Sequence, residues 1–409
     1  MKKKVEQEIS DCQAGYRENR GTIDMLFTLQ ILIEKIRDSE QEAYITFIDY
    51  SKAFDSVIHN HLFQTMSTMG FPKHLIKLIA NLYQGQKATI RWNNEHSKFF
   101  EIQKGVRQGC ILSPHLFNIY TEQIMRNADI EDMGIKCGGR NITNLRYADD
   151  TALLADNITS MRRILHRVDT AGTRAGLKLN AKKTKVMHIG DENTQGIIRI
   201  NRSNLENVND FKYLGSIKSN NGSCGKDIKT RIGMAKQKTV EYNNIWKDRG
   251  IPLGLKLKIL ESLIWPILTY GCEAWTLRKY EEQKIEAAEM WLYRRLLRVK
   301  WTERRTNESI LSQLNIKRHL LRTINKRKLN YIGHAFRNKH TDLMKTTAQG
   351  KVEAKRRKGR PPTTLIGNIT KGNEMKLQEI GWISQDRGRW NVFVNSRTSA
   401  TPEIGDADR

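Results

Sequence analysis

The stretch AYITFIDYSKAFD occupies residues 43–55, and together with YADD at residues 147–150 it decides the fold. Its first seven residues are rich in β-branched and aromatic side chains, which predicts a buried strand that ends on Asp49. YADD lies between apolar segments, which predicts a strand–turn–strand hairpin with Asp149 and Asp150 at its tip. A carboxylate at the end of an apolar strand is costly unless it is paired or bound to a metal. The two segments therefore contain candidate catalytic acids.

If the two strands are neighbours, Asp49, Asp149 and Asp150 converge. Without a cation they would repel one another, and at least one pKa would rise. Carboxylate oxygens suit Mg²⁺, and two ions about 3.5–4 Å apart can activate an attacking hydroxyl and stabilise the leaving oxygen in phosphoryl transfer. Residue types alone leave alternatives open: the paired aspartates could be turn residues, and Asp49 and Asp55 could be capping residues.

The charge of the chain is large and uneven. The 409 residues include 70 Lys and Arg and 44 Asp and Glu, which gives a formal net charge of +26. Residues 1–190 hold 27 basic and 21 acidic residues, whereas residues 191–409 hold 43 and 23. We therefore expect a catalytic first half and a second half that binds a polyanion, with nucleic acid as the partner, because contacts from Lys and Arg to phosphate release counterions.

Composition excludes other classes. No apolar run approaches the roughly 18–20 residues of a membrane span, and the N-terminal residues MKKKVE lack the apolar segment of a secretory signal. The five cysteines are scattered along the chain, which indicates reduced intracellular thiols and no disulfide framework.

Hydrophobic periodicity predicts an α+β fold, with helices on one face of a small antiparallel sheet, followed by a helical region from about residue 227. Ser113 is expected to cap a helix that has Pro114 in its first turn. The spacing predicts further helices at about 22–37, 60–69, 73–83 and 160–175, strands at 145–147, 151–155, 177–179, 185–189 and 211–217, and a hairpin around Asn93–Asn94.

The whole pattern resembles the reverse transcriptases of non-LTR (LINE-like) retrotransposons. Residues 47–55 and YADD resemble motifs A and C of that family, in the family's order and about a hundred residues apart. The other segments that carry the resemblance are QAGYRENRGT at 13–22, GVRQGCILSP at 105–114 (motif B), GLKLNAKKTK at 176–185 (motif D), FKYLGS at 211–216 (motif E), YGCEAW at 270–275 and GRPP at 359–362.

The resemblance implies a role for individual residues. Asp49, Asp149 and Asp150 match the metal-binding catalytic aspartates. Lys183 matches the motif D lysine, a general acid for pyrophosphate, with Lys182 and Lys185 as competitors. Phe54 matches the residue that packs under the sugar and excludes nucleotides with a 2′-hydroxyl. Gln108 and Gly109 match residues beside the incoming nucleotide, and Leu214 and Gly215 match residues at the primer end.

The resemblance also implies the architecture and the reaction. It implies a right-hand polymerase, with partial fingers and palm at 1–225, a helical thumb-like domain at 226–335 and a basic C-terminal tail at 336–409. The implied reaction is RNA-directed DNA synthesis from dNTPs on an RNA template with a DNA primer, using two Mg²⁺ ions, with Mn²⁺ as an alternative.

Several expectations concern the N-terminal region and the cell. Only about ten residues precede the QAGYR segment, so we expect an N-terminally truncated copy that lacks the endonuclease domain and the first finger strands. Arg17 or Arg20 could partly replace the lost triphosphate clamp. The expected location is intracellular, in nucleus and cytoplasm as a ribonucleoprotein, with DNA synthesis in the nucleus. The alternative is a catalytically dead nucleic-acid-binding remnant of such an element.

Overall fold

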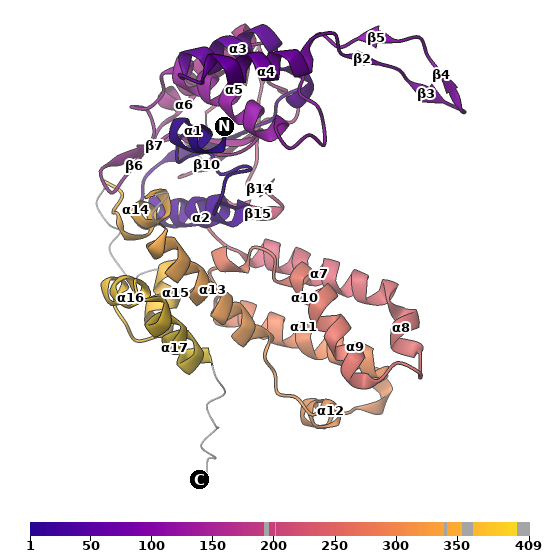
Figure 1. Cartoon of the computed structure of the whole chain (residues 1–409). Coiled ribbons are helices and arrows are strands. Elements are labelled where there is room, and N and C mark those ends of the chain that lie inside the picture. Colours follow the sequence, from indigo (N-terminus) through magenta and orange to yellow (C-terminus); the bar gives the residue numbers. More distant parts are fainter. Residues whose placement is uncertain (192–195, 201, 339–341, 354–362, 399–409) are drawn as a thin grey trace. The chain divides into compact units, whose positions relative to one another are not determined.

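The structure is a computed structural model that describes residues 1–191, 196–200, 202–338, 342–353 and 363–398 (Figure 1). It divides into two compact units. The first unit contains residues 1–214 and the segment with helix α14 (Leu343–Gln349). The second contains the helices between Gly215 and residue 338 and those after residue 362. The domain limits expected at residues 225 and 335 stay predictions, and the GRPP segment lies outside the described residues.

The first unit is built on a five-stranded sheet. In spatial order its strands are β13 (Glu206–Asn207), β10 (Lys185–Ile189), β1 (Ala43–Ile48), β9 (Asp150–Ala155) and β8 (Asn144–Tyr147). All six residues of β1 are buried, as expected for a continuous apolar strand at the centre of a sheet. β1 is antiparallel to β10 and β9, whereas the short β13 pairs in parallel with β10. The antiparallel sheet predicted from the sequence is confirmed, with one parallel edge strand.

Helices cover both faces of this sheet. α6 (Ile158–Arg174) packs on β1 and β9, and α5 (Ser113–Ala128) lies beside α6. α2 (Thr22–Asp38) contacts β8 and β10, and its buried residues are not part of the core beneath α6. The expectation of helices on one face is therefore wrong for α2. This helix is buried around most of its circumference, so it needs neighbours on more than one side.

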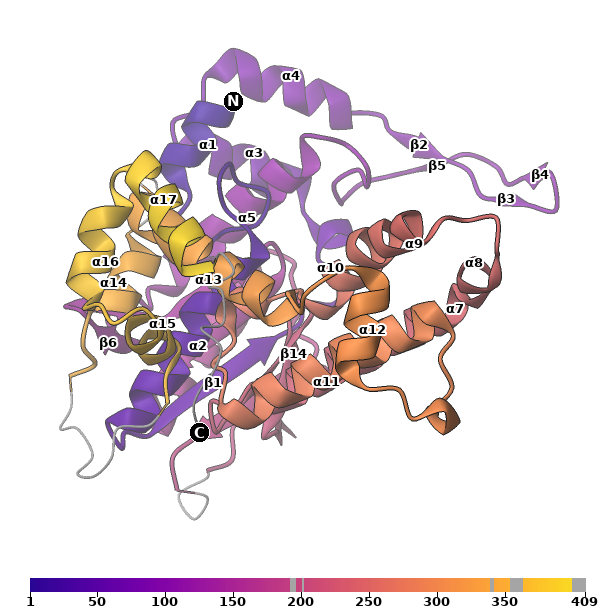
Figure 2. The same ribbon diagram turned by 90° about the horizontal axis from the view of Figure 1, so that it is seen from below.

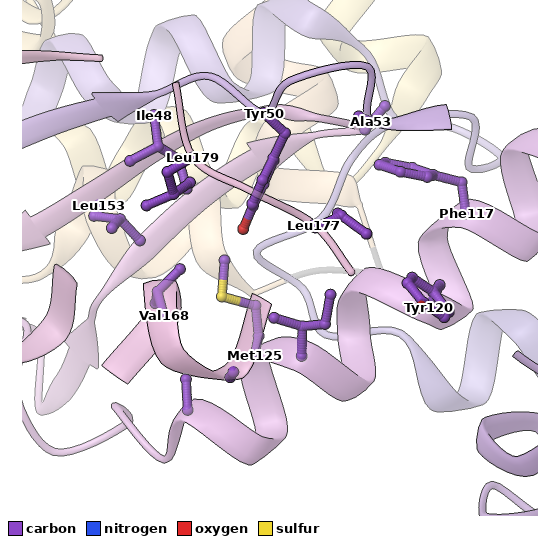
Figure 3. Packing of buried hydrophobic residues seen from close by; sticks show 14 of the residues in the cluster. Ile48, Tyr50, Ala53, Phe117, Tyr120, Met125, Leu153, Val168, Leu177 and Leu179 are labelled. Carbon is purple, nitrogen blue, oxygen red and sulfur yellow. The ribbon is translucent and has the colours of Figure 1, made fainter. Parts of the chain in front are cut away.

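The core between the sheet, α5 and α6 contains aromatic rings beside aliphatic side chains. Figure 3 shows the ring of Tyr50, just beyond β1, directed toward Met125 of α5, with Leu179 and Val168 nearby. This packing fixes the chain directly after Asp49.

α14 completes the first unit by packing on α2. The ammonium group of Lys35 donates to the carbonyl oxygens of Ala348 and Gly350, at the end of α14. The Gly138 N–H donates to the Lys351 carbonyl at 2.9 Å. A Cβ on Gly350 would lie 2.6 Å from the Gly138 Cα, so the two backbones touch and glycine is required.

A β-hairpin arm extends away from α4 (Lys73–Tyr83) in both ribbon views (Figures 1 and 2). Its turn at Asn93 and Asn94 has φ values of 47° and 67°, as predicted for this pair. The other elements of the first unit are α1 (Lys2–Glu8), η1 (Phe54–Ser56), α3 (His59–Thr68), β2 (Lys87–Ala88), β3 (Arg91–Trp92), β4 (Glu95–His96), β5 (Phe100–Glu101), β6 (Ile135–Cys137), β7 (Arg140–Ile142), β11 (Arg199–Ile200), β12 (Ser203–Asn204) and β14 (Asp210–Tyr213).

Three local predictions were wrong. The strand expected at 211–217 is divided into β14 (Asp210–Tyr213) and β15 (Ser216–Ser219) by a turn at Leu214 and Gly215, which both have positive φ. Residues 177–179 form no strand and contribute only an isolated bridge between Leu179 and Tyr50. Ser113 is the first residue of α5, and its hydroxyl donates to the Arg107 carbonyl at 2.6 Å. Because that hydroxyl is engaged outside the helix, Ser113 does not cap α5.

The second unit is helical, as predicted. Its helix α11 (Lys279–Leu297) buries one apolar stripe, formed by Ile285, Ala288, Leu292 and Leu296. Its elements are β15 (Ser216–Ser219), α7 (Gly225–Glu241), α8 (Asn243–Lys247), α9 (Leu253–Ile259), the π-helical turn η3 (Leu260–Ile264), α10 (Trp265–Leu268), η4 (Cys272–Ala274), α11 (Lys279–Leu297), η5 (Trp301–Glu303), α12 (Asn307–Leu314), α13 (Leu320–Arg337), α15 (Leu365–Gly372), α16 (Leu377–Ser384) and α17 (Arg387–Thr398). Among the described residues, none of the helices combines the length and apolar character of a membrane span.

Candidate active site

The register of the sheet brings the three predicted aspartates to one end of it. Ile48 of β1 lies opposite Thr151 of β9 in an antiparallel pair. One step further along this register, Asp49 faces Asp150, the first residue of β9. Asp149 precedes it in the two-residue turn between β8 and β9. The condition set in the sequence argument, that the two acidic segments come from neighbouring strands, is met.

The three carboxylates influence one another electrostatically. Burial raises the pKa of Asp149, and the nearby charge of Asp49 raises it further. Removal from water also raises the pKa of Asp150, followed by the charges of Asp149 and Asp49. This is the unfavourable crowding expected of acids that lack a cation. The site therefore favours a bound positive charge.

The donor set fits a hard divalent cation. Asp49 Oδ2 is buried and accepts no hydrogen bond within the described part of the chain. Within that part, no three Asp, Glu, His or Cys side chains already lie together as a complete metal site. Mg²⁺ needs no such cage, because it usually binds one or two carboxylates and completes its shell with water and substrate phosphates. The assignment of Asp49, Asp149 and Asp150 as ligands stays a prediction.

A loop from motif D supports Asp49. The Asn180 N–H donates to the Asp49 carbonyl at 2.8 Å, and the Asp49 N–H donates to Thr184 Oγ1 at 3.3 Å. The same loop carries Lys183, whose Nζ lies 3.8 Å from Asp49 Oδ2. Its competitor Lys185 donates instead to Glu206 at 2.6 Å. Of these two lysines, Lys183 is the one that lies beside Asp49.

Phe54 is the first residue of η1, six residues beyond the end of β1. Its ring stacks on Phe117 of α5, with ring centroids 4.3 Å apart and an interplanar angle of 13°. The Val106 N–H donates to the Phe54 carbonyl at 2.9 Å, which ties the motif B loop to this turn. The ring is only partly buried against the core, so it packs on the protein and also keeps an accessible surface.

Motif B supplies two exposed residues near this turn. Gln108 Nε2 lies 3.4 Å from Asp55 Oδ1, in a long hydrogen bond. Gly109 has a φ of 81°, and no atom lies within 4 Å of where its Cβ would be. Glycine is therefore needed for the backbone conformation, while the space above it is open to a ligand.

Motif E lies at the boundary of the two units. Phe211 and Tyr213 of β14 pack on Phe47 of β1, with ring centroids 4.2 and 5.4 Å apart. The Tyr213 hydroxyl donates to the Leu145 carbonyl at 2.9 Å. Leu214 and Gly215 follow with φ values of 45° and 81°, which is a tight turn. β14 is thus held on the sheet, and the two predicted primer-end residues come directly after it.

The suggested role for Arg17 and Arg20 is not supported by the geometry. Arg17 is buried, donates to Glu6 at 3.0 Å and also bonds the carbonyls of Ser10 and Gln13. Arg20 donates to Asp11 at 2.8 Å. Both guanidinium groups stabilise the N-terminal segment, so neither is placed to clamp a triphosphate.

These elements define a polymerase palm, in which acids at adjoining strand ends lie beside a lysine-bearing loop and a glycine-containing substrate loop. The family described as "Reverse transcriptase (RNA-dependent DNA polymerase)" matches residues 1–217, which is more than half of the chain. The chain belongs to the reverse transcriptase family, whose members use divalent metal ions. The α+β polymerase fold predicted for the first part of the chain is confirmed, and a helical region follows it.

Three relatives come from transposable elements. The chain is 27% identical over 213 residues to the Pol polyprotein of the retrotransposable element R2DM of Drosophila melanogaster, covering 50% of this chain and 20% of that protein. It is 24% identical over 279 residues to the RNA-directed DNA polymerase from the mobile element jockey of Drosophila funebris, covering 66% and 30%. A transposon-derived protein of Caenorhabditis elegans is 27% identical over 285 residues, covering 65% and 99%. The chain therefore spans less than a third of the two named polymerases.

The raised pKa values predict a pH-dependent response to Mg²⁺. A raised pKa means that the folded protein binds these protons more tightly than the unfolded chain does. The stability that comes from this tighter proton binding is lost as pH rises above about 4 and the acids ionise. Mg²⁺ should offset the loss by binding the ionised acids of the folded state. We expect the gain in melting temperature from Mg²⁺ to be larger at about pH 7.5 than at about pH 4.5.

Differential scanning calorimetry at constant ionic strength measures this gain. Asp149→Asn should reduce it, whereas Asp156→Asn, at an exposed aspartate beyond β9, should leave it unchanged. An equal gain at both pH values would contradict a carboxylate site for the ion.

Proposed function

We propose that this chain is an RNA-directed DNA polymerase of a non-LTR retrotransposon that extends a DNA primer on an RNA template. The observation that carries the proposal is the antiparallel register of β1 and β9, which places Asp49 beside Asp149 and Asp150. The electrostatic coupling of these acids supports it, because a bound cation would offset the repulsion between their ionised forms. Two Mg²⁺ ions, or Mn²⁺, would supply that charge.

In the proposed reaction, the primer 3′-oxygen forms a bond to the α-phosphorus of a dNTP. The bond between that phosphorus and the bridging oxygen of pyrophosphate breaks, and the hydroxyl proton is lost to solvent. The metal ions, when bound, lower the pKa of the hydroxyl and stabilise the charge on the leaving oxygen. Asp49 and Asp149 would hold them, and Lys183 would donate a proton to pyrophosphate, which its distance of 3.8 Å from Asp49 supports.

The substrate would lie against motifs A, B and E. Gln108 and Gly109 would contact the incoming nucleotide from the motif B loop, and Leu214 and Gly215 would support the primer end. The excess of basic residues in the second half would hold the template and primer through their phosphates. We propose that the protein acts within a ribonucleoprotein and synthesises DNA in the nucleus.

Primer extension with Mg²⁺ and dNTPs tests the proposal. We expect incorporation on an RNA template with an annealed DNA primer, dependent on divalent metal and lost in Asp149→Asn. Binding of the same primer–template is measured in parallel by fluorescence anisotropy. Tight binding without any extension in the wild-type protein would support the second candidate, a nucleic-acid-binding remnant. That candidate is favoured by one observation, namely that Arg17 and Arg20 are engaged within the N-terminal segment.

Sugar selection provides a sharper prediction at Phe54. If its accessible ring edge lies beneath the ribose, Phe54→Val should admit rNTPs by removing a clash. We expect the preference for dNTPs over rNTPs to fall by about tenfold or more, which corresponds to about 1.4 kcal/mol for each factor of ten. The measurement is the ratio of dNTP to rNTP incorporation, taken together with a melting curve.

Loss of the stack on Phe117 will also lower stability, so a control is needed. Phe63→Val removes a ring that is partly buried against the same core but belongs to α3. It should lower the melting temperature without changing sugar preference. If Phe54→Val melts earlier and keeps the wild-type ratio, the ring only packs the core.

A further inference from the structure

The turn that carries Asp149 has an unfavourable backbone conformation. Ala148, the first of its two residues, has a φ of 58°. Residues other than glycine are disfavoured in this left-handed region, because their Cβ approaches the following carbonyl oxygen. The glycine or asparagine common at such a hairpin position is absent here. Neighbouring groups must therefore hold the turn in place.

The side chain of Gln13 contacts both backbone polar groups of Ala148. Gln13 Oε1 accepts from the Ala148 N–H at 2.9 Å, and Gln13 Nε2 donates to the Ala148 carbonyl at 3.2 Å. The same Oε1 accepts from the Gly15 N–H at 2.9 Å. Because two N–H groups donate to the same atom, that atom must be the amide oxygen and the other the amide nitrogen. Gln13 is fully buried.

The segment around Gln13 is itself held against the hairpin. The Ala14 N–H donates to the Arg146 carbonyl at 2.9 Å, and the Arg146 N–H donates to the Cys12 carbonyl at 2.7 Å. Asn118 of α5 donates to the Gly15 carbonyl at 2.7 Å. A Cβ on Gly15 would lie 2.3 Å from the Ala148 nitrogen, so the backbone passes directly over the turn.

We propose that Gln13 is a positioning residue that holds Ala148 in its left-handed conformation and thereby aims the Asp149 carboxylate at the reacting atoms. Gln13 would not contact the substrate itself. The inference rests on the proposed function of Asp149, and it assigns the QAGYR segment a role in the palm. Without the two bonds from Gln13, the turn would relax toward the more favourable backbone region, and Asp149 would move with it.

The test replaces Gln13 with a side chain of similar size that forms no amide hydrogen bonds. In Gln13→Met we expect kcat for primer extension to fall by about tenfold or more, with an unchanged KM for primer–template. The matched control is Gln30→Met, at a buried glutamine of α2 that bonds Glu34 at 2.9 Å. It should lower stability and leave kcat within about twofold of wild type. A kcat loss of equal size in both variants would overturn the inference.

Rescue separates positioning from general damage. Glycine adopts positive φ without strain, so Ala148→Gly in the Gln13→Met background should recover at least about threefold in kcat. The same change in the Gln30→Met background should recover nothing. Absence of any recovery in the Gln13→Met background would contradict a role through the backbone of Ala148.

Hydrogen exchange gives a readout that does not depend on activity. Amides of a peptide covering residues 145–152 should exchange faster in Gln13→Met than in wild type or in Gln30→Met. If the wild-type protein does not extend a primer, the proposed function fails, and faster exchange would still show that Gln13 holds the turn. If exchange in this peptide is unchanged, the positioning role fails whatever the activity.

Discussion

Asp149→Asn should abolish primer extension while the protein stays folded and binds primer–template as well as the wild type. The substitution removes one ionised ligand from the site where charge develops during nucleotidyl transfer. Losses of about 3–4 kcal/mol in transition-state stabilisation are typical for single groups of this kind, so the rate should fall by at least about 10²–10³-fold. Single-turnover extension and anisotropy are the two measurements.

Stability distinguishes this outcome from a folding defect. The pKa of Asp149 is raised by burial and by Asp49, so a neutral side chain relieves unfavourable charge. We therefore expect Asp149→Asn to melt no lower than the wild type without metal, and to bind nucleic acid equally or slightly more tightly. Asp156→Asn is the matched control and should extend normally. A parallel loss of binding, stability and turnover in Asp149→Asn would count against the site.

Glu122→Leu should be among the most destabilising single changes in the first unit. Arg146, in the strand before the turn, is 1% exposed and donates to Glu122 at 2.8 Å. Glu122 is itself only 4% exposed. Removal of one partner leaves a buried charge without compensation, which costs about 3–5 kcal/mol. Urea unfolding monitored by circular dichroism measures the change in unfolding free energy.

The double variant tests whether the ion pair is the cause. Glu122→Leu with Arg146→Met removes both charges and should recover most of the loss, because a buried ion pair contributes little beyond an apolar pair of similar volume. Glu131→Leu, at an exposed position after α5, should change stability by less than about 0.5 kcal/mol. A double variant no more stable than Glu122→Leu would show that packing at Glu122 matters more than charge.

The parts of the fold that depend on local chemistry could be predicted from the sequence. β1 was predictable because its residues are continuously apolar and β-branched, and Asp49 follows directly. The helix at 73–83 was predicted with both ends correct, since Pro72 precedes it and apolar residues follow at helical spacing. The pairing of the two acidic segments was only a condition in the sequence argument, and the register of β1 and β9 meets it.

Features that depend on distant partners could not be predicted. Residues 177–179 alternate as a strand would, but the bonds from Ser51 N–H to the Lys178 carbonyl and from Asn180 N–H to the Asp49 carbonyl form a single bridge between Leu179 and Tyr50. The ladder does not extend beyond that bridge. The sequence predicted Ser113 as a helix cap, but its hydroxyl donates to the Arg107 carbonyl instead. Gln13 carries no periodicity signal, and its role is visible only because the fold brings it to Ala148.

The return of α14 to α2 has a consequence for synthesis on the ribosome. Every strand of the five-stranded sheet precedes residue 214, whereas Ala348 and Gly350, whose carbonyl oxygens accept from Lys35, are made much later. Chains grow at about 5–20 residues per second, so roughly 7–27 s separate these two points. During that interval α14 is not yet available to pack on α2, so the apolar side chains that it covers in the folded protein are exposed. A polypeptide that ends before this helix would contain Asp49, Asp149 and Asp150 but would lack the packing of α14 on α2.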